Sequence, residues 1–484
     1  QASTVFRDLG EGLTGYTADG RLVPAAAAAW TLSDDGLVYT FTLEPENRWS
    51  DGTPLTAHDF VFAFRRLVDP LTAAVSASSI DAVANAEAIV AGELPVEDLG
   101  VRALAELTLE ITLTQPTPYF LSQLTYPGTF PVNEASIVAH GDDHARPGNL
   151  VTNGAYRLVD AVPGSLIELE RNPYFRDTAN TAIDSVNYHV LVEPMSEYNR
   201  FRAGELHITS TVPPDIFASV QEQFPAALRV APSLGVYYYG LNVTRPPFAG
   251  NRELRQALSM AIDREVLVDK ITGRGEEPAY SWVPPGIPGY EPPQLRYRNM
   301  TQDERNAQAR RLYFSAGYSE ENPAMIELRY NTSEEHQKIA LAIQSMWRDV
   351  LGVETTLINE EFRVLLNNMR ERKITEAFRS SWNGDYNDAH TFLSILESDS
   401  TWNLPGWQNE EFDSLMERAG SQLDPQTRTR FLEEAERVLL AEQAVIPLYF
   451  YNSRHLVSPV VEGWEDNILD YHYSHHLSLR AAGN

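Results

Sequence analysis

Two carboxylates lie three residues apart in the stretch SWNGDYND, residues 381–388. These acids, Asp385 and Asp388, could form a general acid/base pair, hold a metal ion or pair with a cation. Arg379, six residues before Asp385, offers a planar fork for a carboxylate, while an aspartate can pair with an ammonium group. A short peptide or another zwitterion would find both partners here. An internal Arg–Asp salt bridge explains the same spacing, so these alternatives stay open.

No motif of a known enzyme chemistry accompanies the two acids. The chain contains no GxSxG, HExxH or P-loop pattern, and it has no cysteine that could act as a nucleophile or bind zinc. With 67 acidic residues among 484, carboxylate pairs at this spacing arise by chance. We therefore predict a protein that is not an enzyme and carries no cofactor.

Histidines gather near the C-terminal end of the chain. His472, His475 and His476 lie in YHYSHH, and His455 lies a little earlier. On a helix this spacing would direct the imidazoles to one side, where they could bind a metal ion. The surrounding DYHYSHHLSLR is more typical of strand or coil. We expect a solvated terminal segment and no metal site.

The charge balance excludes several classes of partner. The formal net charge is −29, which argues against binding to nucleic acid or to an anionic membrane surface.

No apolar run reaches the roughly 18 residues that span a bilayer, so we expect no membrane insertion. The start, QASTVFRDLGEGL, has neither the basic residues nor the apolar stretch of a signal peptide. We expect a mature, processed or incomplete N-terminus.

The first part of the chain is predicted to form strands around one helix. Residues 37–43 alternate apolar and polar side chains, and residues 108–113 resemble a second strand. Between them, Thr56 can cap a helix that ends at Pro70. Proline and glycine punctuate residues 145–160, which we interpret as a crossing between lobes.

Alternating strands and helices predict an α/β organisation for the rest. The clearest helix spans 251–271, begins at Asn251 and repeats apolar residues with helical spacing. A chain of 484 residues exceeds one hydrophobic core, so two or three domains are expected. The other predicted segments are helices at 302–316, 335–351, 409–420 and 426–442 and strands at 165–175, 229–242, 325–331, 353–359 and 444–452.

Six stretches in order along the chain resemble the oligopeptide-binding proteins of bacterial ABC importers, the peptide/nickel class of solute-binding proteins. They are residues 6–43, 49–70 (WSDGTPLTAHDFVFAFRRLVDP), 147–158 (PGNLVTNGAYRL), 241–248 (LNVTRPPF), 255–268 (RQALSMAIDREVLV) and 381–393 (SWNGDYNDAHTFL). The resemblance implies an α/β fold of two lobes that close about a hinge, with a third, smaller α+β domain inserted on lobe I. It assigns lobe I to 1–23, 151–235 and 453–484, the extra domain to 24–150, and lobe II to 236–452.

The resemblance also implies a ligand site. In peptide-binding members, the aspartate matching Asp385 pairs with the ligand's α-ammonium group, and segments matching 381–383 and 11–13 bond the peptide main chain. Arg379, Arg370 and, for longer ligands, His336 match positions that meet the ligand's carboxylate. The complete implied set is Asp385, Arg379, Trp382, Ser381, Asn383, Glu11, Gly12, Leu13, Arg370, His336, Phe362 and Tyr239.

Some positions depart from the family pattern. An extra residue near Arg370 means that Met369 could occupy its place, and the lysine that serves longer peptides falls at Thr272, with Arg274 nearby. The pocket segment AVSASSID, residues 74–81, has no aromatic ring. Recognition of the ammonium group is left intact, while the preferred peptide length and side chains stay open.

The implied function is that of a periplasmic, monomeric receptor. It would bind short peptides between its lobes and deliver them to the inner-membrane permease subunits of an ABC importer, without contact to nucleic acid. Alternatives on the same fold are receptors for murein peptide, an opine-like solute or a nickel chelate.

Overall fold

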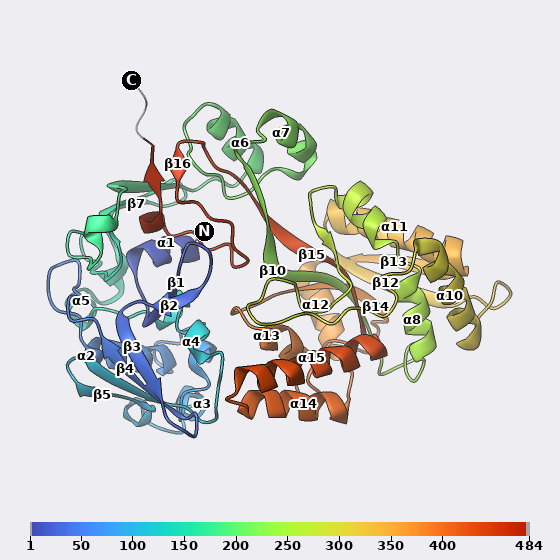
Figure 1. The fold of residues 1–484 in the computed structure, drawn as a ribbon, viewed down its shortest axis with the longest axis horizontal. Coiled ribbons are helices and arrows are strands. Elements are labelled where there is room, and N and C mark those ends of the chain that lie inside the picture. The colour runs from blue at the N-terminus through green and yellow to red at the C-terminus, as the bar shows by residue number, and fades with distance from the viewer. Residues whose placement is uncertain (1, 481–484) are drawn as a thin grey trace. The chain divides into compact units, whose positions relative to one another are not determined.

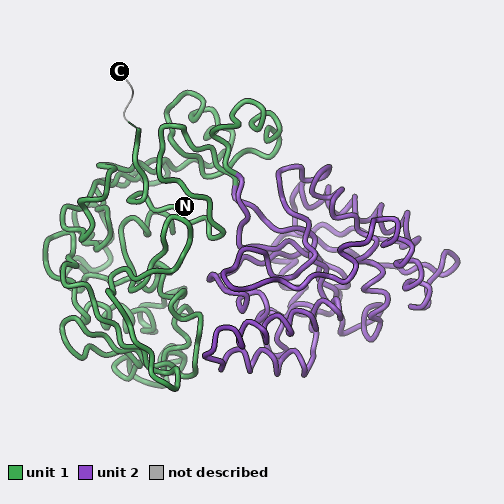
Figure 2. The backbone as a smooth tube through the Cα atoms, in the orientation of Figure 1, with its two compact units in different colours: residues 1–229, 454–484 green, residues 230–453 purple. Residues whose placement is uncertain are grey.

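The computed structural model describes residues 2–480, and the chain divides into two compact units (Figure 2). Unit 1 contains residues 1–229 and 454–484, and unit 2 contains residues 230–453. The finer division of unit 1 into a lobe and an extra domain remains a prediction. None of the helices described is both long and apolar enough to cross a bilayer.

Unit 1 is built on a four-stranded and a three-stranded antiparallel sheet (Figure 1), in the orders β3-β4-β6-β5 and β7-β8-β9. The helices are α1 (Ala2–Leu9), α2 (Ala57–Val68), α3 (Ala86–Val90), α4 (Phe120–Gln123), α5 (Glu134–His140), α6 (Pro194–Arg202) and α7 (Phe217–Gln223). The strands are β1 (Thr14–Tyr16), β2 (Leu22–Pro24), β3 (Ala27–Leu32), β4 (Val38–Leu43), β5 (Val101–Ala105), β6 (Thr108–Thr112), β7 (Tyr156–Val162), β8 (Leu166–Arg171), β9 (Ser185–His189), β16 (Val461–Glu462) and β17 (Ser478–Leu479).

The four-stranded sheet confirms the strands and the helix predicted at its centre. Phe41 on β4 and Leu109 on β6 are fully buried and share one apolar core with Phe60 of α2. The helix begins where Thr56 and Asp59 form a reciprocal capping box, which satisfies two backbone donors of its first turn.

Unit 2 contains one mixed sheet of six strands in the order β11-β15-β10-β14-β12-β13. Two strands, β10 (Leu228–Leu241) and β15 (Val445–Leu456), each contain one of the two boundaries between the units. The other strands are β11 (Glu277–Pro278), β12 (Met325–Asn331), β13 (Glu354–Glu360) and β14 (Ala377–Asn383).

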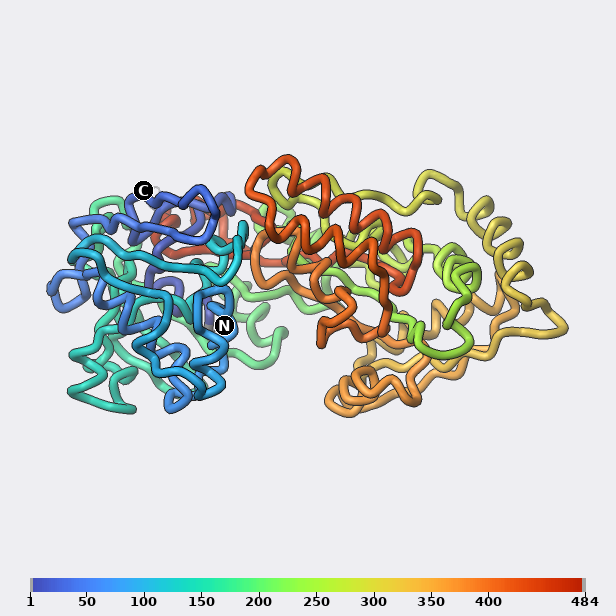
Figure 3. The backbone as a smooth tube through the Cα atoms, turned by 90° about the horizontal axis from the view of Figure 1, so that it is seen from below, coloured from blue at the N-terminus to red at the C-terminus, as the bar shows by residue number. Residues whose placement is uncertain are grey.

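Helices accompany this sheet along the chain. They are α8 (Arg252–Met260), α9 (Arg264–Val266), α10 (Gln302–Ser315), α11 (Glu334–Leu351), α12 (Phe362–Glu371), α13 (His390–Leu393), α14 (Glu410–Ser421) and α15 (Pro425–Glu442). The last two lie side by side, coloured orange to red in Figure 3. The structure confirms the four helices predicted after residue 300 and the strands β12, β13 and β15. Each of these elements starts within one residue of its predicted start.

The helix predicted over 251–271 is confirmed at both ends but is interrupted over residues 261–263, and its second part consists of α9 and a π-helical turn at Leu267–Thr272. The first part stops after Met260, and a new short helix starts because the Asp263 side chain accepts a hydrogen bond from the Val266 amide. Arg264 is fully buried at this break, where its guanidinium donates to the carbonyls of Ala279 and Ser259. These tertiary bonds hold a break that the apolar spacing does not reveal.

Candidate functional site

One edge of β14 is open over most of its length. On one side, β10 pairs with β14 in an antiparallel register that runs from Leu241 opposite Ala377 to Gly235 opposite Asn383. On the other side, β12 pairs only with Ala377 and Phe378. No described strand therefore covers this edge over residues 379–383, so its backbone groups can accept an added strand.

Arg379 is a buried cation on β14. Its guanidinium donates to Asn331 Oδ1 at 3.2 Å and to the Tyr451 hydroxyl at 3.1 Å. It also lies over the Tyr237 ring, 4.6 Å from the centroid, while its Nε has no hydrogen-bond partner among the described residues. No carboxylate of the described chain forms an ion pair with Arg379, and a buried cation held only by neutral groups is a strong site for an anion.

Tyrosine rings from neighbouring strands surround this cation. Tyr237 on β10 stacks on Tyr449 of β15 with ring centroids 4.6 Å apart, and Tyr451 meets Tyr237 edge to face. The predicted ligand residue Tyr239 lies opposite Arg379 in the sheet and is fully buried. The Tyr239 hydroxyl has no hydrogen-bond partner among the described residues. The rings replace water around Arg379 by neutral, polarisable groups.

His336 lies beside this cluster but differs from the predicted cation. Its Nδ1 is 3.3 Å from the Tyr237 hydroxyl. Burial, together with the nearby charge of Arg379, lowers the pKa of His336 to about 4. The imidazole is therefore neutral near pH 7. In the protein without a ligand it is placed to form a hydrogen bond rather than an ion pair.

Arg370 belongs to a separate aromatic cluster near the end of α12. Its guanidinium lies 5.1 Å from the Trp402 ring centroid, and Trp402 contacts Trp382 edge to face at 5.5 Å. Met369 is buried whereas Arg370 is exposed, so of these two neighbours only Arg370 can meet a ligand. Phe362, at the start of α12, has about half of its surface exposed.

The two aspartates of SWNGDYND have different surroundings. Asp388 accepts two hydrogen bonds from the Arg428 guanidinium, at 2.8 and 2.9 Å, and is thus part of an internal ion pair. Asp385 is exposed, and no described cation pairs with its carboxylate. Desolvation by neighbouring atoms raises the pKa of Asp385 above its ordinary value. Of the two acids, Asp385 is the one available to a cationic ligand.

The predicted segment Glu11–Leu13 of unit 1 is held by its own unit. The Glu11 carboxylate pairs with Arg176, and burial raises the pKa of Glu11. The Asn153 side chain forms two hydrogen bonds with the Glu11 backbone. It accepts one from the Glu11 amide and donates one to the Glu11 carbonyl. At Gly12, a Cβ atom would lie 2.4 Å from the Leu124 carbonyl oxygen, so a side chain does not fit there. This segment is a rigid stretch of backbone.

The substitute cation suggested near Thr272 is already engaged. Arg274 is buried and pairs with Glu276 at 3.1 Å and with Glu335 at 2.6 Å. Thr272 donates to the Glu276 carboxylate at 2.9 Å. Because two carboxylates neutralise its charge, Arg274 cannot take the place of a ligand-binding lysine.

Comparison with known proteins agrees with this architecture. Residues 21–403 match the bacterial extracellular solute-binding proteins, family 5 Middle. The chain is 38% identical over 465 residues to the periplasmic oligopeptide-binding protein OppA of Escherichia coli (strain K12), covering 96% of this chain and 85% of that protein. Fold and sequence together define an extracellular solute-binding protein, and the chain belongs to family 5 of that class.

Solved structures give the same result. The unliganded open form of the periplasmic murein tripeptide binding protein MppA aligns with a TM-score of 0.91 at 34% identity, covering 99% of this chain and 92% of that one. Haemophilus influenzae OppA in complex with RPPGFSPFR aligns with a TM-score of 0.76 at 34% identity, covering 99% and 94%. The predicted peptide/nickel class and its two-lobed α/β fold are confirmed.

Sequence reasoning missed the residues that hold the site in place. Asn331 and Tyr451 position Arg379, Trp402 lies under Arg370, and Arg428 neutralises Asp388. Each partner is at least 30 residues away from the group it contacts, so no local spacing indicates the contact.

Replacing Asp388 by alanine is expected to destabilise unit 2. Arg428 would keep its buried position but lose its bidentate partner, and breaking a buried ion pair by removing one member costs about 3 kcal/mol. Urea unfolding monitored by tryptophan fluorescence measures the loss. Asp399→Asn, at an exposed position, serves as the control. Equal stability of both variants and the wild type would show that the ion pair is not structural.

His390 is expected to make stability depend on pH. Burial lowers its pKa to about 4, below the roughly 6.5 of an unfolded chain. Between these values the unfolded chain binds a proton that the folded chain excludes, so this contribution is complete above pH 6.5 and is lost as the pH falls. As the pH falls from 6.5 to 4, the free energy of unfolding should therefore decrease less steeply in His390→Gln than in the wild type. The two slopes should differ by up to about 1.4 kcal/mol per pH unit. Identical slopes for both proteins would contradict this assignment.

Proposed function

We propose that this protein is a receptor that binds short oligopeptides outside the cytoplasm and delivers them to an ABC permease without chemical turnover. The observation that carries the proposal is the open edge of β14, with a buried, anion-free Arg379 on the strand and an unpaired Asp385 two residues after its end. A peptide is a zwitterion with a main chain that can extend such a sheet. The printed names of the similar OppA proteins, which are periplasmic and oligopeptide-binding, support this proposal.

The edge of β14 gives affinity without demanding a particular sequence. Main-chain hydrogen bonds to residues 381–383 are the same for every peptide. The strand rises by roughly 3.3 Å per residue, so the five residues from Arg379 to Asn383, four steps apart, span roughly 13 Å. That length suits a peptide of three or four residues, whose ends would then face opposite charges.

Each end of the peptide has a proposed partner. The Asp385 carboxylate receives the α-ammonium group. Arg379 or the exposed Arg370 receives the α-carboxylate, depending on peptide length, and neutral His336 adds a hydrogen bond for longer ligands. Glu11, Gly12 and Leu13 of the other lobe add main-chain contacts when the lobes close, as the family resemblance implies.

Closure of the lobes is proposed to report the bound peptide to the permease. The chain passes between the two units within the neighbouring strands β10 and β15, which are the proposed hinge. A ligand favours the closed state only through contacts made to both lobes. Delivery needs one receptor chain, and we propose a monomer in the periplasm.

Blocking the peptide's amino terminus is expected to abolish binding. N-acetylation removes the ammonium group and leaves Asp385 buried without a partner in the complex, which is costly. Asp385→Ala should weaken binding of a free tripeptide by about 2–5 kcal/mol. Isothermal titration calorimetry with free and acetylated tri- and tetrapeptides measures both effects.

Asp399→Asn is the matched control for the Asp385 variant, because Asp399 is also an exposed acid of unit 2. It should bind peptide like the wild type. Equal affinity for free and acetylated peptides, or a change below tenfold in Asp385→Ala, would remove Asp385 from the proposed role.

Arg379→Met is expected to weaken the binding of those peptides whose length brings their α-carboxylate to Arg379. Methionine retains apolar volume beside Tyr237 but removes the charge, so the buried carboxylate of that ligand loses its partner. Titration with di-, tri-, tetra- and pentapeptides should show a loss of about 2–5 kcal/mol at one length and a smaller loss at the others. A uniform loss at all lengths would indicate a structural role instead.

A second candidate ligand is murein tripeptide. The similarity to MppA, whose solved open form aligns over 99% of this chain, supports it. The segment 74–81, which lacks aromatic rings, leaves side-chain selection open. Competition between murein tripeptide and an ordinary tripeptide in the same calorimetric assay distinguishes the two ligands.

A further inference from the structure

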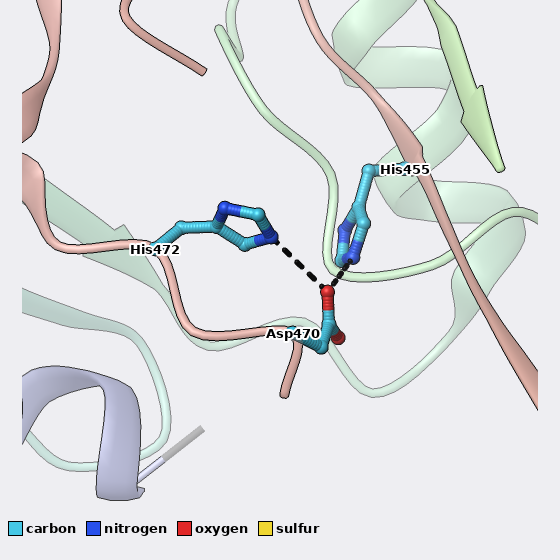
Figure 4. A group of neighbouring side chains, drawn as sticks. All are labelled: His455, Asp470 and His472. Carbon is cyan, nitrogen blue, oxygen red and sulfur yellow. Dashed lines mark hydrogen bonds and ion pairs between the residues drawn. The ribbon is translucent and has the colours of Figure 1, made fainter. Parts of the chain in front are cut away.

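A group of two imidazoles and a carboxylate lies in unit 1 and contains none of the residues of the proposed peptide site. Figure 4 shows His455 and His472 directed at the same oxygen of Asp470. The Nε2 atom of His455 is 2.8 Å from Asp470 Oδ1, and that of His472 is 3.2 Å from it. All three ligand atoms lie within 4.8 Å of one another.

These distances suit a small divalent ion with little rearrangement. A tetrahedral zinc ion with bonds of about 2.0–2.1 Å holds its ligand atoms roughly 3.3 Å apart. The His472 pair already has this separation, and the His455 pair needs to open by only about half an ångström. Two imidazole nitrogens and one carboxylate oxygen are a ligand set typical of zinc.

A second contact fixes which nitrogen of His455 faces the site. Its Nδ1 lies 2.8 Å from the Thr209 carbonyl oxygen, and a carbonyl can only accept, so Nδ1 carries the proton of this bond. The other nitrogen, Nε2, faces Asp470 Oδ1 at 2.8 Å and donates to it, so a bound ion would take the place of the proton between them. A hydrogen bond from the outer nitrogen of a histidine to a backbone carbonyl is the usual support of a metal ligand.

The loop that carries the other two ligands is held in place. The Asn467 side chain donates to the carbonyls of Ala18 and Tyr471 and accepts from the Tyr471 amide. The His472 ring stacks on Trp464 with centroids 3.5 Å apart. The ligands are therefore positioned by bonds that do not depend on an ion, which lowers the cost of ordering the site.

The group has an approach path and room for a further ligand. His455, Asp470 and His472 all line a cavity of about 1310 Å³ within unit 1. Three protein ligands with one open position is the arrangement in which zinc retains a water or an exogenous ligand. An entry path and supporting contacts are expected of a metal site, and His455 has such a contact at its outer nitrogen.

We propose that His455 Nε2, Asp470 and His472 Nε2 bind one zinc-class divalent ion. The ion ties the loop from Trp464 to His472 to the end of β15, one residue beyond the unit boundary at Arg454. The histidines His475 and His476, which the sequence groups with His472, are not part of the site. They pack on each other, with centroids 4.2 Å apart, and His475 lies against Phe175.

Titration of chelator-treated full-length protein with Zn²⁺ alone tests the site. Calorimetry should give one ion per chain, and the midpoint of thermal unfolding should rise with added Zn²⁺. His472→Gln and Asp470→Asn should each weaken Zn²⁺ binding by roughly 100-fold. Asparagine tolerates the positive φ of 55° at position 470, so this variant keeps the backbone of the site.

His58→Gln is the matched control, because His58 is an exposed histidine of the same unit. It should bind Zn²⁺ like the wild type. The absorption spectrum of Co²⁺ bound to the wild-type protein gives a readout that does not depend on folding of any variant, and tetrahedral bands are expected. Absence of one-to-one Zn²⁺ binding, absence of these bands, or equal affinities in His472→Gln and His58→Gln would overturn the proposal.

Discussion

The antiparallel register between β10 and β14 determines what the candidate site can do. Seven residue pairs join the strands, and the register places Tyr239 opposite Arg379 and Tyr237 opposite Ser381. Arg379 is thereby buried among rings, while β12 contacts β14 at only two residues and leaves the rest of that edge open. A shift of one residue would turn each side chain to the opposite face. The charge of Arg379 and the open backbone edge of β14 therefore lie together only because this register is fixed.

The neutral surroundings of Arg379 agree with its proposed role as the partner of a ligand's carboxylate. Among the other buried guanidinium groups of unit 2, Arg274 meets the carboxylates of Glu276 and Glu335, whereas Arg264 donates to backbone carbonyls that hold the chain in place. Arg379 meets an amide, a hydroxyl and aromatic rings instead. An internal acid would stabilise the empty protein and compete with a ligand's carboxylate. Retaining a buried charge without a counterion costs stability but keeps the strongest interaction for the ligand.

The sequence was sufficient for elements whose pattern is local. The alternation of β4 and the apolar spacing of α8 lie within each segment and were located from periodicity, and the segments of α11, α15 and β12 were also predicted from their own residues. The sequence was not sufficient where contacts between distant residues determine the local structure or the charge of a side chain. The break before Arg264 depends on the distant carbonyls of Ala279 and Pro447, and the pKa of His336 depends on burial. The family resemblance supplied the site residues, and the structure supplied their partners and hence their charge states.

The two short clusters in the sequence demonstrate why spacing alone misassigns chemistry. Asp385 and Asp388 are three residues apart, yet one is free for a ligand and the other neutralises Arg428. Among the C-terminal histidines, the neighbours His475 and His476 pack on each other, while His472 converges with His455, 17 residues away, on an aspartate that the histidine pattern did not include. In both cases the chemistry of a residue follows from the group that it faces in space. For a binding protein, the residues that still lack an internal partner are therefore the informative ones.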